Sequence, residues 1–146
     1  MDPLIFTIFG ASGDLAKRKL IPALFELHLD GLLPKGFAIL GVSRTEFSDE
    51  AFRDELFLKN DLLDLSKADG KLKADFANML YYQAIPDYEK ADYAVVKNRL
   101  AELDQQFGLP GNYIFYLSTP PSLYTVIPQK LSEQGLNENG AHWRRL

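Results

Sequence analysis

The sequence predicts one α/β domain, in which a doubly wound, mainly parallel sheet has helices on both faces. Two observations support this prediction. Short apolar runs alternate along the chain with segments of helical periodicity, which is typical of βαβ units and a parallel sheet. The runs are apolar nearly throughout, as strands buried on both faces are. The length of 146 residues suits a single domain with its own core.

Four runs are predicted to be strands. They are "LIFTIF" at 4–9, "FAILGV" at 37–42, "MLYYQAI" at 79–85 and "YIFYLS" at 113–118. Each is too short for a buried helix of ordinary length and is rich in β-branched or aromatic residues. Connections between parallel strands are right-handed, so helices are expected to cover both faces of the sheet.

A helix is predicted from Asp14 to a stop near Gly31. Its apolar positions recur at spacings of three and four, which defines one buried face. These positions are Ala16, Leu20, Ala23, Leu24 and Leu27. Pro22 has no N–H to bond to Arg18, so we expect a kink or a short break there.

The later helices follow the same reasoning. Residues 49–79 are predicted to be mostly helical, with Ser48 as N-cap and a turn near "KADG" at 67–70. Further helices are expected from Tyr88 to about Phe107 and from Leu123 to about Leu131. "GLPGN" at 108–112 separates the first of these from the fourth strand.

Composition excludes several classes of function. The net charge is −4 and the pI is near 5.1, so we expect no general nucleic-acid binding. Cysteine is absent, which excludes disulfides and thiolate metal sites and fits a cytoplasmic protein. No leader peptide or membrane span is expected. No metal site is expected either, because the acids around Asp49 look like a solvated helix face.

The turn after the first strand is the strongest candidate site. Gly10 ends the strand and Gly13 opens the helix, giving the pattern G-x-x-G-x-x-A with Ala16. Glycines let a pyrophosphate approach bare backbone at a helix N-terminus, where the helix dipole adds roughly half a positive charge. The alternative is a tight turn that binds nothing. Its position inside a βαβ unit favours a Rossmann-type dinucleotide site.

The end of the second strand indicates the cofactor. A site for NAD usually has an acid there for the ribose hydroxyls, whereas "GVSRTE" offers Ser43, Arg44 and Thr45. Arginine binds phosphate bidentately, so NADP is favoured over NAD. The alternative is an ordinary exposed cation in a loop.

The loop after the fourth strand should line the same crevice, because ligands lie beyond the carboxyl ends of parallel strands. It reads "LSTPPSLY", with Pro120, Pro121 and Tyr124. A structural proline turn with a core tyrosine is an equally good reading of this loop. Neither His28 nor His142 has the partner residues of a catalytic site. The chain stops at "AHWRRL" without a terminating signal, so we expect a fragment.

The quoted motifs resemble the N-terminal portion of the glucose-6-phosphate dehydrogenase family. "FGASGDLAKRKLIPALFEL" is similar to the family's cofactor loop, and "GVSR" and "LSTPPSLY" also match. The resemblance runs from Ile5 to Trp143. It implies an enzyme that oxidises glucose 6-phosphate to 6-phosphogluconolactone with NADP, which is a step of the pentose phosphate pathway. It also implies a homo-oligomer.

The resemblance also assigns residues. It places the pyrophosphate on a loop made of Gly10, Ala11, Ser12, Gly13, Asp14, Leu15 and Ala16. It places Ser43 and Arg44 at the 2′-phosphate, and Pro120, Pro121 and Tyr124 on the nicotinamide side. Asp87 and Tyr88 would contact the cofactor after the third strand, although relatives often carry glycine nearby. Lys19 matches a lysine that faces the substrate.

Parts of the family pattern are absent. The motif E-K-P-F-G, expected after a strand that follows Leu146, does not occur, and neither does R-I-D-H-Y with its base histidine. Residues 1–146 are therefore expected to be an incomplete Rossmann domain without the substrate domain and without a catalytic residue. The alternative is a non-catalytic NADP-binding protein that ends naturally at Leu146. A short-chain reductase, which would use a Tyr-x-x-x-Lys pair on a later helix, is disfavoured.

Overall fold

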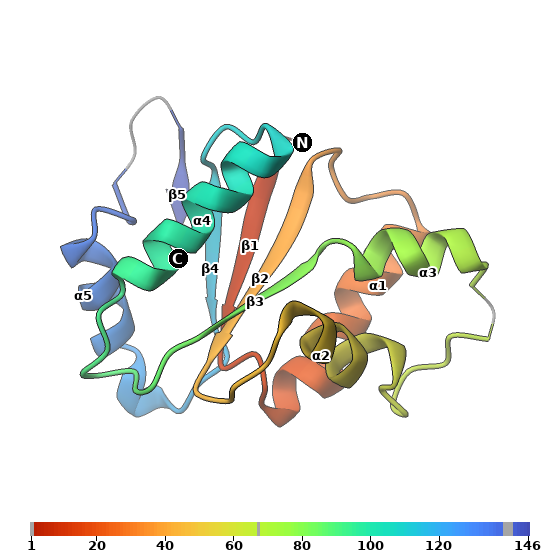
Figure 1. The fold of residues 1–146 in the computed structure, drawn as a ribbon, viewed down its shortest axis with the longest axis horizontal. Helices are drawn as coiled ribbons and strands as arrows, with labels where there is room; N and C mark the ends of the chain where they lie inside the picture. The colour runs from red at the N-terminus through yellow and green to blue at the C-terminus, as the bar shows by residue number, and fades with distance from the viewer. Residues whose placement is uncertain (1, 67, 139–141) are drawn as a thin grey trace.

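Five strands form one parallel sheet in the order β3-β2-β1-β4-β5 (Figure 1). The computed structural model describes residues 2–66, 68–138 and 142–146. The strands are β1 (Leu4–Phe9), β2 (Phe37–Ser43), β3 (Leu80–Ala84), β4 (Tyr113–Leu117) and β5 (Arg144–Arg145). The chain starts in the centre with β1, builds outwards to β3, and crosses back to add β4 and β5. This order confirms the predicted doubly wound, Rossmann-type α/β fold.

Helices cover both faces of the sheet (Figure 1). On one face lie α1 (Ile21–Leu29), α2 (Asp49–Arg53), the π-helical turn η2 (Asp54–Leu58) and α3 (Gly70–Ala77). On the other lie α4 (Ala94–Phe107) and α5 (Val126–Glu133). Side chains of β1 alternate between the two cores: Ile5 and Phe9 pack with α4 and α5, while Leu4 and Ile8 pack with α1 and α2.

The first helix starts at Asp14 as predicted, but the turn that follows is not α-helical. Residues Ala16–Leu20 form a π-helical turn, η1, in which the Ile21 N–H donates to the Ala16 carbonyl. Pro22 then stands at the beginning of α1, so the expected break lies just before it. The wider turn adds one residue to the repeat. Ile21 is consequently fully buried, whereas Leu20 is half-buried.

The shift continues through α1 and corrects the predicted buried face. Ala16 and Leu24 are buried as predicted, and Phe25 is buried as well, but Ala23 is exposed. Leu27 is also exposed, at 39%. The prediction assumed an uninterrupted repeat of 3.6 residues, and the π turn invalidates that assumption.

A buried asparagine completes the π turn. In this turn the Lys17 carbonyl would pair with the N–H of residue 22, and Pro22 has none. The Asn60 amide donates to the Lys17 carbonyl at 3.0 Å and also to the Leu56 carbonyl at 3.0 Å. Asn60 is only 3% exposed, so it satisfies a carbonyl that would otherwise be buried without a partner.

Some of the other helix boundaries differ from the prediction. Ser48 caps α2 as predicted, accepting from the Ala51 N–H at 3.0 Å. The helical run ends at Leu58, and the next helix, α3, begins only at Gly70 with Asp69 as its N-cap. Lys67 of the predicted turn lies outside the described residues. The helix expected from Tyr88 starts at Ala94.

The predicted strands are confirmed with small shifts at their ends. The fifth strand is a correction, because it begins at Arg144 and not after Leu146. It pairs in parallel with the start of β4, and the Arg144 side chain donates to the Gly111 carbonyl at 2.9 Å. In the described part of the chain, no helix has the length and apolarity needed to cross a bilayer.

Candidate functional site

The carboxyl ends of β1, β2 and β4 meet at the lower edge of the sheet in Figure 1. This edge is the switch point of the topology, where the strand order reverses between β1 and β4. A cavity of about 470 Å³ lies there. Its lining residues are Gly10, Ser12, Gly13, Ser43, Arg44, Thr45, Pro86, Tyr88, Ser118, Thr119 and Pro120.

Gly10 holds the turn tightly against the sheet. Its φ is +84°, and a Cβ at this position would lie 2.3 Å from the Ser118 carbonyl oxygen. The Gly10 N–H donates to the Val42 carbonyl at 2.8 Å, so the turn is tied to β2 as well. Only glycine fits this position, and the requirement comes from the protein itself.

Gly13 is a different case. A Cβ there would meet only the Gly10 carbonyl oxygen, at 3.2 Å, and the residue is exposed. The open space above Gly13 therefore faces outwards at the start of the helix, where a phosphate could lie against the backbone.

The rest of the loop divides between packing and surface. Ala11 and Ala16 are buried, at 1% and 0% exposure, and let the helix approach the sheet closely. A Cβ on Gly41 in β2 would lie 2.5 Å from the Phe52 ring and 2.8 Å from the Ala11 Cβ, so this glycine, which the sequence did not point to, makes room for both α2 and the loop. Asp14 is exposed and pairs with Arg18 at 3.2 Å, and Leu15 is 45% exposed.

Four hydroxyl groups meet beside the loop. Ser43 at the end of β2 donates to the Ser12 Oγ at 2.8 Å, and Thr45 donates to the same oxygen at 3.1 Å. The Tyr82 hydroxyl lies 2.5 Å from the Ser43 Oγ. Ser12 and Thr45 are exposed, whereas Ser43 is only 2% exposed, so Ser43 contacts the cavity from below.

Arg44 is exposed at the mouth of the cavity. Its guanidinium carbon lies 5.9 Å from the centre of the Tyr88 ring. Burial raises the pKa of Tyr88, so this ring stays neutral at ordinary pH. Arg44 thus forms a positively charged ledge over the ring of Tyr88, which is itself only 8% exposed.

Asp87 belongs to the same corner. Its carboxylate accepts from the N–H groups of Glu89 at 2.6 Å and Lys90 at 2.9 Å, and these bonds hold its pKa below the ordinary value. A smaller cavity of about 210 Å³ here shares Arg44, Tyr88 and Pro120 with the larger one. The two cavities form one continuous candidate site.

Some predicted site residues lie outside these cavities. Pro121 begins the 3₁₀ helix η3 (Pro121–Leu123), and Tyr124 is 49% exposed beyond it. Lys19 is exposed on η1, outside the lining. Sequence reasoning missed Ser118 and Thr119, whose buried hydroxyls have no hydrogen-bond partner among the described residues. Buried hydroxyls are normally paired. The signal that could have found these two residues is their position in "LSTPPSLY", directly before the two prolines.

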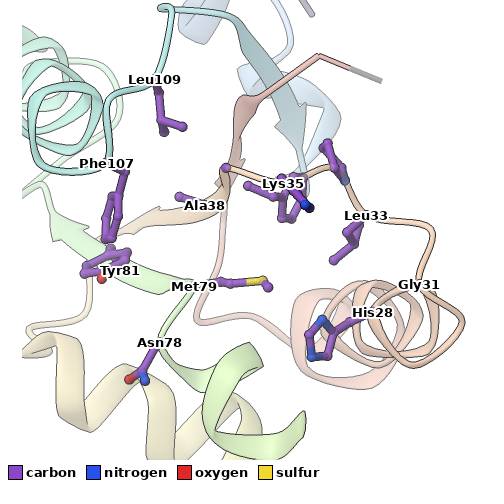
Figure 2. A pocket seen from close by; sticks show the side chains of 13 residues that line it. His28, Gly31, Leu33, Lys35, Ala38, Asn78, Met79, Tyr81, Phe107 and Leu109 are labelled. Carbon is purple, nitrogen blue, oxygen red and sulfur yellow. The ribbon is translucent and has the colours of Figure 1, made fainter.

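A second cavity, of about 450 Å³, lies at the opposite end of the sheet (Figure 2). In it Tyr81 and Phe107 stand side by side, with Met79 between them and the helix that carries His28. The His28 Nε2 lies 3.1 Å from the Leu72 carbonyl, so one side of its ring is already engaged. The walls are mostly apolar and lie at the amino ends of β2 and β3, away from the switch point.

The pattern Tyr-x-x-x-Lys, which a short-chain reductase would use, occurs once, at Tyr93 and Lys97. Tyr93 is only 1% exposed, its hydroxyl donates to the Tyr88 carbonyl at 2.8 Å, and burial raises its pKa. A catalytic tyrosine needs an accessible hydroxyl with a lowered pKa. This pair is therefore structural. In the described ranges, no group of three or more His, Asp or Glu side chains is placed to hold a metal.

Comparisons with known proteins agree with this geometry. Residues 7–146 match the family model described as "Glucose-6-phosphate dehydrogenase, NAD binding domain". Glucose-6-phosphate 1-dehydrogenase of Aggregatibacter actinomycetemcomitans is 48% identical over 95% of this chain, and that of Treponema pallidum is 40% identical over 99%. Each alignment covers 28% of the relative's length.

A solved structure of a glucose-6-phosphate dehydrogenase in complex with glucose 6-phosphate is also similar. It superimposes with a TM-score of 0.82 at 31% identity, over 99% of this chain and 29% of that one. This chain therefore spans less than a third of the proteins that it matches.

Proposed function

This chain belongs to the glucose-6-phosphate dehydrogenase family, and we propose that it is the NADP-binding portion of an enzyme that oxidises glucose 6-phosphate to 6-phosphogluconolactone. The family model and the relatives support this proposal. The substrate would be bound largely by parts of the full-length protein beyond these residues, since the cavity at the switch point has the position and lining of a nucleotide site.

The single observation that supports NADP most directly is the position of Arg44. It follows the last residue of β2, where an NAD site would carry an acid, and it is exposed beside the hydroxyls of Ser12 and Thr45. Towards a phosphate, the Arg44 guanidinium would supply charge and N–H donors, and the Ser12 hydroxyl, whose oxygen accepts from Thr45, would supply one further donor.

The remaining assignments form one continuous path. We propose that the pyrophosphate lies over Gly10–Gly13 and that the adenine lies on the ledge of Arg44 and Tyr88. Asp87 would hold this corner through its two backbone hydrogen bonds. Pro120 and the Thr119 hydroxyl would face the nicotinamide half, with Pro121 and Tyr124 beyond them.

When bound, NADP would supply the hydride acceptor. The residues of this chain would bind and orient it. Lys19, exposed one turn after the loop, is proposed to face the sugar phosphate. A cytoplasmic homo-oligomer is proposed for the full-length protein, on the family resemblance and the absence of cysteine.

The test of this proposal is Arg44→Ala in the full-length protein. Loss of a charged phosphate contact should weaken NADP binding by about 1.5–3 kcal/mol and leave NAD binding nearly unchanged. Calorimetric titration with both cofactors measures this. Arg145→Ala is the matched control, because it removes an exposed arginine at the other end of the sheet. Equal losses for NADP and NAD in Arg44→Ala would contradict the role of Arg44.

A further inference from the structure

Tyr82 lies directly beneath the candidate 2′-phosphate site, and nothing in the sequence pointed to it. It is the third residue of β3 and is only 4% exposed. Its ring packs against Phe52 at 4.9 Å and edge-on against Phe47 at 5.3 Å between ring centres. The ring is therefore fixed, and its hydroxyl points up into the group of serine and threonine hydroxyls.

The Tyr82 hydroxyl has two neighbours. It donates to the Thr45 backbone carbonyl at 2.5 Å, and it lies 2.5 Å from the Ser43 Oγ. A carbonyl oxygen can only accept, and the Ser43 proton is donated to Ser12, so the single phenolic proton is shared between the Thr45 carbonyl and the Ser43 Oγ. Burial raises the pKa of Tyr82, which keeps that proton in place at neutral pH. The segment from Ser43 to Thr45 is thus tied to β3 from below.

The same network determines where the Ser12 proton points. The Ser12 oxygen accepts from both Ser43 and Thr45, which uses both of its lone pairs. Its own proton must then point away from these two residues. Because Ser12 is exposed on the cavity wall, that proton faces the cavity and is available to an anion.

We propose that Tyr82 is a positioning residue for the 2′-phosphate. By holding the Thr45 carbonyl and supporting Ser43, it fixes the segment that carries Arg44 and orients the Ser12 proton towards the phosphate. Ser43 then acts through Ser12 and does not contact the phosphate itself. This inference rests on the proposed function, because it concerns how the same site selects NADP over NAD.

The test uses Tyr82→Phe in the full-length protein, with NADP and NAD as the probes. The ring and its packing remain, and only the hydroxyl is lost. We expect the dissociation constant for NADP to rise about five- to tenfold, as for the loss of one or two neutral hydrogen bonds, and that for NAD to change less than twofold. A merely structural role would weaken both cofactors alike, and that result, or an unchanged NADP constant, would overturn the proposal.

Tyr81→Phe is the matched control. It removes a hydroxyl from the neighbouring residue of β3, whose side chain lies on the opposite face of the sheet. Neither dissociation constant should change. If wild-type protein shows no preference for NADP, or if Arg44→Ala leaves that preference intact, the proposed function has failed, and the Tyr82 inference fails with it. If only Tyr82→Phe lacks an effect, the inference alone has failed.

Two further variants test the path of the effect without altering β3. Ser43→Ala removes one donor to Ser12, so it should weaken NADP selectively, by less than Ser12→Ala does. The double variant Ser12→Ala, Tyr82→Phe should lose less than the sum of the two single changes, because Tyr82 acts partly through Ser12. Additive losses, or an unaffected Ser43→Ala, would contradict the network.

Discussion

Two glycines of one loop have different reasons to be glycine. Gly10 is required by the fold, since its positive φ and the Ser118 carbonyl at 2.3 Å leave no room for a Cβ. A Cβ on Gly13 would meet a single neighbour, the Gly10 carbonyl oxygen at 3.2 Å, so a small shift would accommodate it. The pattern G-x-x-G predicted both positions but gave them one shared purpose. Only the structure separates the glycine that builds the turn from the one that leaves room over it.

This difference predicts two separate outcomes. Gly13→Val should fold and lose nucleotide binding, because the added methyl groups fill the space proposed for the pyrophosphate. Gly10→Ala should instead destabilise the fold by several kcal/mol, because backbone atoms must move. Calorimetric titration with NADP and thermal unfolding of both variants measure this. NADP affinity retained in a folded Gly13→Val protein would contradict the assignment of the loop.

Ser43 and Arg44 show how far a motif reaches at the residue scale. The sequence placed both residues at the end of the second strand and therefore beside the first loop. It could not show that Ser43 is 2% exposed while Arg44 is exposed, because this depends on β2 being buried along its whole length and on Tyr82 packing against Ser43. Tyr82 is far from the motifs in sequence and resembled an ordinary core residue.

The π turn is the main lesson at the scale of elements. Pro22 predicted an irregularity in the helix, but the sequence did not show whether the helix would kink, break or widen. Asn60, which satisfies the Lys17 carbonyl, is 43 residues away along the chain. A contact of this kind is tertiary and has no local signal, so a uniform helical repeat predicted Ala16 and Leu24 correctly but misplaced Leu20, Ala23 and Leu27 on the buried face.

Neighbouring substitutions in this turn test the shifted face. Ile21 is 0% exposed, so Ile21→Ala should lower the free energy of unfolding by about 2–5 kcal/mol. Leu20→Ala should cost clearly less, because Leu20 is only half-buried. Urea unfolding of the two variants makes the comparison. A larger loss of unfolding free energy for Leu20→Ala than for Ile21→Ala would support the unshifted repeat and contradict the π turn.

The contact between α4 and β4 predicts a dependence on pH. The Tyr113 hydroxyl donates to the Asp104 carboxylate, whose other oxygen is buried without a partner among the described residues. Burial raises the pKa of Asp104 above its ordinary value. The folded protein therefore holds this proton more tightly than the unfolded chain does. That contribution to stability is present below the ordinary pKa and is lost as pH rises through the folded value.

Asparagine at position 104 keeps an acceptor for Tyr113 and does not titrate. The stability of Asp104→Asn relative to wild type should therefore improve as pH is raised from about 3 to about 7. Urea unfolding at several pH values within this range measures the difference. A difference that stays constant or falls with pH would contradict the raised pKa.

At the scale of the whole molecule, the order of elements was the most predictable feature. Apolar strands separated by helices allow few parallel arrangements, and the Gly10 turn marks β1 as the central strand. The sequence misplaced β5, because the run "WRRL" has no apolar signal and its two arginines pair with β4 through the backbone. Short polar strands of this kind are recognised only from their neighbours.

The arrangement of the titratable groups leads to a prediction for residues 1–146 produced alone. Oxidation of a sugar hydroxyl needs a base to take the proton as hydride leaves. His28 lies at the opposite end of the sheet from the cofactor cavity, and His142 lines a separate cavity near β5. The Asp87 carboxylate, although near the cofactor cavity, already accepts two backbone N–H groups. None of these three groups is placed to act as the base.

Residues 1–146 alone should therefore show no turnover with glucose 6-phosphate and NADP, even where calorimetry finds that the folded polypeptide binds NADP. The appearance of reduced cofactor measures turnover, and the full-length protein is the positive control in the same assay. The physical reason is a division of work: this sheet edge offers backbone, hydroxyls and a guanidinium to hold phosphates, and neither histidine of the described ranges lines its cavity. Turnover above a heat-killed control would mean that a base exists within these residues and that Asp87 or a histidine has been assigned wrongly.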